Sequence, residues 1–155
     1  MGFQTSRSNN NPELMLLLHS SIYKQILKTT AESSMIESVG LGFGTQDGTI
    51  IQMRNFILMD NLDNSMYSFS LDYEILLKEI EIHEKKGARL LGFFHTHPEK
   101  ASIYPSEKDR YYMNFWPYPY IWMIAGVEEF PELRIFSLFK GKIVEIPFRI
   151  SKKRS

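Results

Sequence analysis

Hydrophobic positions change their period along the chain, and these changes divide it into candidate helices and strands. Over residues 12–32, apolar residues recur at steps of three and four, which is typical of one helix face. These positions are Met15, Leu18, Ile22 and Ile26. Two β-rich stretches, 37–45 and 49–60, flank an Asp-Gly pair at 47–48 that favours a hairpin. The pattern predicts a first helix followed by two antiparallel strands.

The rest of the chain continues this alternation of helix and strand patterns. Ser70 is a candidate N-cap for a second helix that ends at Gly87, because serine side chains cap helix starts and glycine suits helix ends. Its expected inward positions are Tyr73, Leu76, Leu77 and Ile80. A buried strand over 88–97 and a short helix from Ser106 to about Phe115 come next. Strands over 119–127, 132–140 and 142–150 complete the predicted set.

These elements predict an α+β fold, in which helices flank a mixed, largely antiparallel β-sheet within a single domain. A chain of 155 residues has the commonest size for one domain. We expect a disordered N-terminus over 1–11, a folded domain over 12–150 and a basic tail over 151–155.

Composition narrows the classes of function. Lys and Arg number 18 and Asp and Glu also number 18, so nothing in the charge calls for a nucleic-acid or anionic membrane partner. The longest aliphatic cluster, Leu14 to Leu18, is too short to span a bilayer, and we expect a cytoplasmic protein. The chain has no cysteine, so any zinc site must use nitrogen and oxygen ligands.

The stretch GFFHTHPEKASIYPSEKD, residues 92–109, carries the candidate chemistry. Residues i and i+2 of a strand share a face about 6.6 Å apart, so the imidazoles of His95 and His97 can converge on one ion. Asp109 falls in the first turn of the following helix, where its carboxylate could face the histidines. Two imidazoles and one carboxylate leave zinc a fourth coordination position, the open arrangement that is typical of catalytic zinc sites.

Each part of this pattern also has a structural interpretation. Ser106 and Asp109 are spaced like a capping box at a helix start, and His-x-His pairs are common on exposed strands. The combination, with a proline directly after the histidines, favours a metal site. The remaining histidines, His19 and His83, fall on predicted helices and are expected to be structural or solvated.

The motifs HTHP at 95–98 and PSEKD at 105–109 together resemble the JAMM (MPN+) metalloproteases, which are zinc isopeptidases and peptidases acting on ubiquitin and ubiquitin-like proteins. That family also places a glutamate just before a glycine-rich strand, and Glu37 precedes such a segment at 38–44. The resemblance extends from the first helix to the strand near Pro119. Met35 and Gly42 depart from the usual pattern without touching a catalytic position.

The resemblance implies a role for each residue of the motifs. His95, His97 and Asp109 would bind Zn²⁺, Glu37 would be the general base, and Ser106 would stabilise the oxyanion. It also implies a fold related to that of cytidine deaminases. The core lacks room for the two long insertions of eukaryotic deubiquitinating members, which favours a compact prokaryotic-type member.

The implied substrate is a ubiquitin-like or sulfur-carrier protein, cleaved from a lysine or from a short C-terminal extension. Two alternatives stay open: a non-catalytic scaffold of the same fold, and a zinc amidase acting on a small peptide. The sequence also leaves a homodimer open. One aromatic group could belong to the core and a dimer surface or could line a docking face, and core is the expectation for most of it. The group comprises Tyr111, Tyr112, Phe115, Trp116 and Tyr118.

Overall fold

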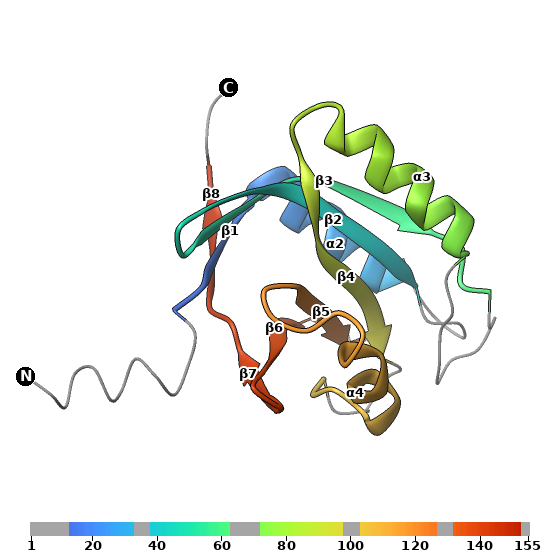
Figure 1. The fold of residues 1–155 in the computed structure, drawn as a ribbon, viewed down its shortest axis with the longest axis vertical. Coiled ribbons are helices and arrows are strands. Elements are labelled where there is room, and N and C mark those ends of the chain that lie inside the picture. The colour runs from blue at the N-terminus through green and yellow to red at the C-terminus, as the bar shows by residue number, and fades with distance from the viewer. Residues whose placement is uncertain (1–12, 33–37, 63–71, 98–102, 127–131, 153–155) are drawn as a thin grey trace, which may run out of the picture.

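A computed structural model of the chain describes residues 13–32, 38–62, 72–97, 103–126 and 132–152. Within these ranges the chain forms three helices and eight strands (Figure 1). The helices are α2 (Ser20–Glu32), α3 (Tyr73–Glu84) and α4 (Glu107–Met113). The strands are β1 (Met15–His19), β2 (Val39–Asp47), β3 (Ile50–Met59), β4 (Arg89–His97), β5 (Ile121–Gly126), β6 (Glu132–Phe139), β7 (Lys142–Glu145) and β8 (Phe148–Ser151).

All eight strands join one sheet in the order β7-β6-β5-β4-β2-β3-β1-β8. The β2–β3, β2–β4, β5–β6 and β6–β7 pairs are antiparallel, whereas β1 runs parallel to β3 and β8, and β4 runs parallel to β5. The hairpin at Gly48 forms as predicted, with a positive φ of 64° at the glycine. The prediction of an α+β fold with a mixed, largely antiparallel sheet is confirmed.

The sheet has a hydrophobic core on each face. On one face, Ile22 and Ile26 of α2 pack against buried side chains of the central strands. On the other face, Leu76 of α3 and Met113 of α4 belong to a second cluster that includes Phe93 of β4. In Figure 1, α2 lies behind the central strands, whereas α3 and α4 flank β4. Side chains that point to the same side of β4 as Phe93 therefore lie on the face that carries α3 and α4.

The predicted first helix is wrong over its first turns, because residues 15–19 form strand β1. Leu14, Leu16 and Leu18 are buried while Met15 and Leu17 between them are half-buried, which is the period of a strand. β1 fits between β3 and β8, with Leu16 opposite both Ile51 and Phe148. Only the later positions, Ile22 and Ile26, lie on the buried face of a helix as predicted.

The second helix was predicted correctly in place but not in detail. Ser70 lies outside the described residues, and Asp72 caps α3 by accepting hydrogen bonds from the N–H groups of Glu74 and Ile75. Leu76 is buried, but Tyr73 and Leu77 are each 59% exposed, so their predicted inward orientation is wrong. The buried face of α3 instead runs through Leu76 and His83, seven residues or two turns apart.

The last predicted strand, 142–150, is two strands on opposite edges of the sheet. β7 pairs with β6, and β8 pairs with β1. Pro147 lies between them; it has no N–H to donate to a ladder, while its carbonyl accepts a hydrogen bond from Leu16. The prediction failed because the apolar pattern of 142–150 continues through Pro147. The pattern therefore does not show that the chain passes there from one edge of the sheet to the other.

The structure describes only part of the predicted domain organisation. The segment predicted to be disordered, 1–11, lies outside the described residues, so the division at residues 11 and 12 stays a prediction. Ser151, placed in the basic tail, is the last residue of β8. Among the helices that the structure describes, none is long and apolar enough to cross a membrane.

Gly92 is expected to be essential to the pairing of β4 with β5. A Cβ atom at this position would overlap the backbone carbonyl of Ile121, so Gly92→Ala should lower the free energy of unfolding by about 3 kcal/mol. The control is Gly126→Ala, whose Cβ would meet, among the described residues, the Cγ2 methyl of Ile103 at 2.7 Å and no backbone atom. Urea unfolding should show the smaller loss for the control, and equal losses would contradict this explanation.

Candidate metal centre

Strand β4 lies in the middle of the sheet and carries His95 and His97 at its C-terminal end. β4 lies between β2 and β5, with His95 opposite Val39 on one side and Ile124 on the other. Because side chains alternate along a strand, both imidazoles lie on the face that carries α3 and α4, and Thr96 lies on the opposite face. His95 is 1% exposed and His97 is 7% exposed, so both rings are buried.

Helix α4 brings Asp109 to the two histidines. Its N-cap is Ser106, whose Oγ accepts a hydrogen bond from the Asp109 N–H at 3.1 Å. The Asp109 carboxylate accepts in return from the Ser106 N–H at 2.9 Å, which completes a capping box. One turn later, the buried side chain of Met113 anchors the helix in the core. This local geometry turns the Asp109 carboxylate, 4% exposed, toward β4.

The candidate ligand atoms of three residues meet at this point. His95 Nε2 lies 3.0 Å from Asp109 Oδ1, and His97 Nε2 lies 3.0 Å from Asp109 Oδ2. The two Nε2 atoms are 3.2 Å apart. In the described part of the chain, these residues form the one group of three or more histidine, cysteine or acidic side chains close enough to share a metal ion.

The donor set fits a zinc ion. Zinc binds histidine nitrogen and carboxylate oxygen at about 2.0–2.1 Å, and adjacent ligands of a tetrahedral site are then about 3.3 Å apart. The separations of 3.0 and 3.2 Å in the cluster are close to that value. Two imidazoles and one carboxylate also match the three-ligand composition of catalytic rather than structural zinc sites.

The electrostatics of the site favour an ionised Asp109. Burial by itself would raise the pKa of this carboxyl group. The charge of His95 and hydrogen bonds from His95, His97 and the Ser106 N–H outweigh burial, and they hold the pKa of Asp109 well below its usual range. An anionic oxygen in a buried site suits a divalent cation.

The capping and metal-binding interpretations of Asp109 are compatible in this structure. Its Oδ2 accepts the Ser106 N–H and also lies 3.0 Å from His97 Nε2, while Oδ1 faces His95. The cap therefore orients the carboxylate for the histidines. The sequence alone presented the two roles as alternatives because it did not show which oxygen serves which partner.

Glu37 lies outside the described residues, but its neighbour Ser38 is tied to β4. The Ser38 N–H donates to Thr96 Oγ1 at 2.9 Å, and the Ser38 carbonyl accepts from the Thr96 N–H at 3.0 Å. The sequence motifs assigned no role to Thr96. The alternation along β4 identifies its face, but only the register of β2 against β4 identifies its partner.

The other two histidines have local structural roles, as expected. The His83 ring stacks on Phe43 with centroids 3.9 Å apart, and its Nδ1 lies 2.9 Å from the Glu79 carbonyl. His19 Nδ1 lies 2.8 Å from Ser21 Oγ at the start of α2. Neither residue belongs to the candidate metal cluster.

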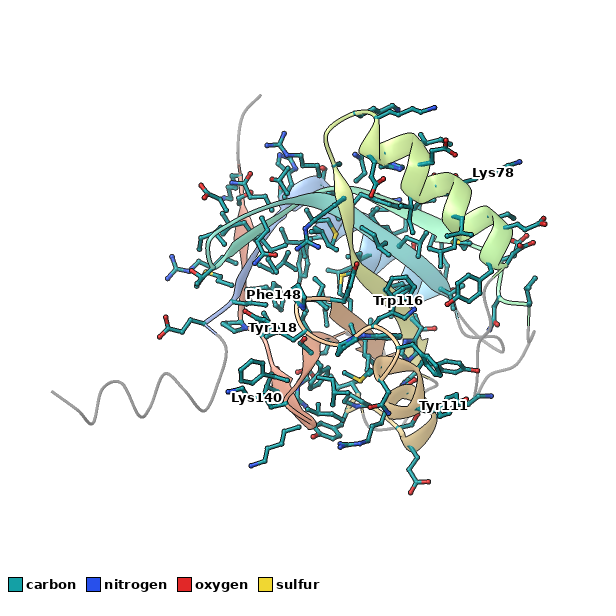
Figure 2. The ribbon with its side chains drawn as sticks, in the orientation of Figure 1. Lys78, Tyr111, Trp116, Tyr118, Lys140 and Phe148 are labelled. Atoms are coloured by element: carbon teal, nitrogen blue, oxygen red, sulfur yellow. The ribbon has the colours of Figure 1, made fainter. Side chains whose placement is uncertain are left out.

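The aromatic group around α4 divides between surface and interior. Tyr111 and Phe115 are mostly exposed, with ring centroids 5.3 Å apart. Trp116 is half-buried and its ring lies edge-on to Phe93 at 5.2 Å, and Tyr118 packs against Phe139. Figure 2 shows Tyr111 on the outer side of α4 and Trp116 nearer the middle of the molecule. Tyr112, Trp116 and Tyr118 pack against the hydrophobic core, as expected for most of the group, whereas Tyr111 and Phe115 do not.

A buried cluster of two histidines and one carboxylate at the end of a central strand defines a candidate metal-dependent hydrolase site. The chain matches the family of prokaryotic homologs of the JAB domain over residues 19–138, and it belongs to that family. The sequence resemblance to a compact prokaryotic JAMM (MPN) protein is thereby confirmed.

Two individual proteins are similar to this chain over most of their length. A desampylase from Pyrococcus furiosus is 33% identical over 132 residues, which cover 84% of this chain and 87% of the relative. The solution structure of protein DSY2949 from Desulfitobacterium hafniense superimposes with a TM-score of 0.78 at 26% identity, covering 90% of this chain and 94% of that one. The fold is therefore shared by a solved structure almost from end to end.

Proposed function

We propose that the protein is a zinc-dependent isopeptidase or peptidase. Its substrate would be the amide bond that joins the C-terminus of a ubiquitin-like or sulfur-carrier protein to a lysine or to a short C-terminal extension. The observation that carries the proposal is the convergence of His95, His97 and Asp109 in a buried site of a JAB-family chain. The similarity to a desampylase supports a ubiquitin-like modifier as the substrate.

His95, His97 and Asp109 would hold the zinc ion. Bound zinc supplies Lewis-acid chemistry, polarising a carbonyl group and lowering the pKa of water to about 7. The chain supplies the orientation of the ligands. The Ser106 N–H holds the Asp109 carboxylate in place, and the strand geometry of β4 keeps both imidazoles on one face.

Glu37 would act as the general base. Its carboxylate would take a proton from the attacking water as the new C–O bond forms at the amide carbon. The same carboxyl group would pass that proton to the lysine nitrogen as the C–N bond breaks, so that a carboxylate and a free amine are the products. The attachment of Ser38 to Thr96, between the two histidines in sequence, supports this assignment.

Ser106 would stabilise the negative charge that develops on the amide oxygen. Its Oγ accepts the Asp109 N–H, and this bond uses a lone pair rather than the hydroxyl hydrogen. The residue is exposed, unlike the three candidate ligands, so a substrate can reach it. The hydroxyl would donate a hydrogen bond to the oxyanion.

Ser106→Ala is expected to lower kcat by about 10²- to 10³-fold, because it removes an oxyanion donor. It should also lower the free energy of unfolding by about 1 kcal/mol through loss of the α4 cap. Asp72→Ala, which removes the cap of α3, is the matched control and should lower stability with little change in kcat. The oxyanion role is wrong if the two variants, measured on the same substrate, lose equal activity.

The substrate class is tested by comparing two probes. A ubiquitin-like protein joined through Gly-Gly to a lysine side chain should be cleaved, and bare dipeptides should react much more slowly. Cleavage of dipeptides alone would favour the zinc amidase. Zinc binding without either reaction would remove the isopeptidase proposal, and absence of zinc would favour the scaffold. A homodimer and a cytoplasmic location stay predictions.

A further inference from the structure

We propose that Thr96 is a positioning residue, which fixes the start of β2 and thereby the adjoining Glu37 relative to the metal ligands. The inference rests on the proposed function, since it concerns the general base of that reaction. Thr96 lies between His95 and His97 in sequence but points to the opposite face of the sheet. It would therefore act without touching zinc or substrate.

The geometry of the link between β2 and β4 supports this role. The regular register of β2 against β4 begins with Val39 opposite His95, so that Ser38 and Thr96 form the next pair. In a regular hydrogen-bonded antiparallel pair, two residues exchange two main-chain bonds. Here the Thr96 N–H donates to the Ser38 carbonyl as usual, but the Ser38 N–H donates to the Thr96 hydroxyl oxygen instead of a carbonyl.

This side-chain bond is the link that a substitution can remove. The hydrogen bond is partly buried, and Thr96 itself is 1% exposed. Without the hydroxyl, the Ser38 N–H would lose the acceptor that it has at the start of the β2–β4 pairing. The position of the chain at Ser38 would then be less well defined, and so would that of the residue attached to it.

The consequence for catalysis follows from the sensitivity of proton transfer to distance. A misplacement of about 1 Å in a reacting group can lower a rate about 10²-fold. The histidines are held independently, by the strand and by Asp109, so they should keep their positions. Loss of the Thr96 hydroxyl should consequently affect turnover and leave metal binding intact.

A purely structural role for Thr96 makes a different prediction. Valine has the shape of threonine and an equal or higher preference for strands, so a residue needed only for packing should tolerate Thr96→Val. Serine keeps the hydroxyl but loses a methyl group from a buried position. The positioning role therefore predicts that Thr96→Ser restores what Thr96→Val loses, whereas the packing role predicts the reverse order.

The test measures kcat, KM and zinc per chain for both variants, on a modifier–lysine conjugate. Thr96→Val should lower kcat by about 10- to 100-fold, with KM within about twofold and zinc content unchanged. Thr96→Ser should stay within about threefold of the unaltered protein. In a chain that already carries Glu37→Gln, Thr96→Val should cause little further loss, because the group that it positions is absent. Unchanged kcat in Thr96→Val, or full additivity with Glu37→Gln, would overturn the proposal.

Failure of the proposed function gives a separate result. If the unaltered protein binds zinc but cleaves no conjugate, the isopeptidase assignment is wrong. The link itself is then tested by hydrogen exchange of the Ser38 amide, which Thr96→Val should accelerate by about tenfold or more and Thr96→Ser should leave nearly unchanged. Equal exchange rates in all three proteins would show that the hydroxyl does not hold Ser38.

Discussion

Glu37→Gln is expected to lower kcat by about 10²- to 10⁴-fold while the chain keeps its zinc. Glutamine has nearly the same shape as glutamate but cannot accept the proton of the attacking water, so general-base catalysis is lost. Zinc binding should survive, because the proposed ligands are His95, His97 and Asp109. Steady-state kinetics and zinc per chain, measured on the same preparation, give both quantities.

The control for this variant is Glu107→Gln, which removes an exposed carboxylate from the first turn of α4, two residues from Asp109. It should retain nearly full activity, since neither the ligands nor the cap involve its side chain. If Glu37→Gln lost as much zinc as a ligand variant does, Glu37 would be a ligand instead of a base. The proposed division between base and ligands would then be wrong.

Asp109→Ala is expected to weaken zinc binding by at least about 100-fold and to abolish turnover. The substitution removes the one anionic ligand and leaves two imidazoles, and loss even of groups that only support ligands costs 10- to 100-fold in affinity. Competition with a chromophoric chelator measures the affinity directly. Full zinc affinity in Asp109→Ala would exclude this residue as a ligand.

Asp109→Asn separates the two roles of the side chain. Its amide oxygen can still accept the Ser106 N–H and preserve the capping box, but the negative charge is gone. In the metal-free chain, Asp109→Ala should therefore be less stable than Asp109→Asn by about 1 kcal/mol. Both variants should bind zinc poorly, since an amide oxygen is a weaker ligand than a carboxylate. Equal stability of the two metal-free variants would mean that the cap contributes little to the position of α4.

The candidate site was predictable from the sequence because its geometry is local. The period of a strand places His95 and His97 on one face whatever the rest of the sheet does. The spacing of Ser106 and Asp109 fixes Asp109 in the first helical turn, where the capping box turns its carboxylate. Only the approach of α4 to β4 depends on tertiary packing, and the family resemblance is what predicted it.

The errors in the fold arise where distant partners decide the structure. The run from Leu14 to Leu18 is aliphatic at every position, so it satisfies the period of a helix as well as that of a strand. Pairing with β3 and β8 selects the strand, and β8 lies at the far end of the chain. The crossing of the chain at Pro147 and the role of Thr96 are equally non-local, since both depend on which strands are neighbours.

The zinc content of the unaltered chain tests the central claim most directly. It should be measured after dialysis against metal-free buffer and again after zinc is added, beside a chain that carries His95→Ala and His97→Ala together. The proposal predicts about one zinc per unaltered chain and close to none in the double variant. No zinc in the unaltered chain after reconstitution would mean that His95, His97 and Asp109 form only a structural cluster, and the proposed hydrolase would be contradicted.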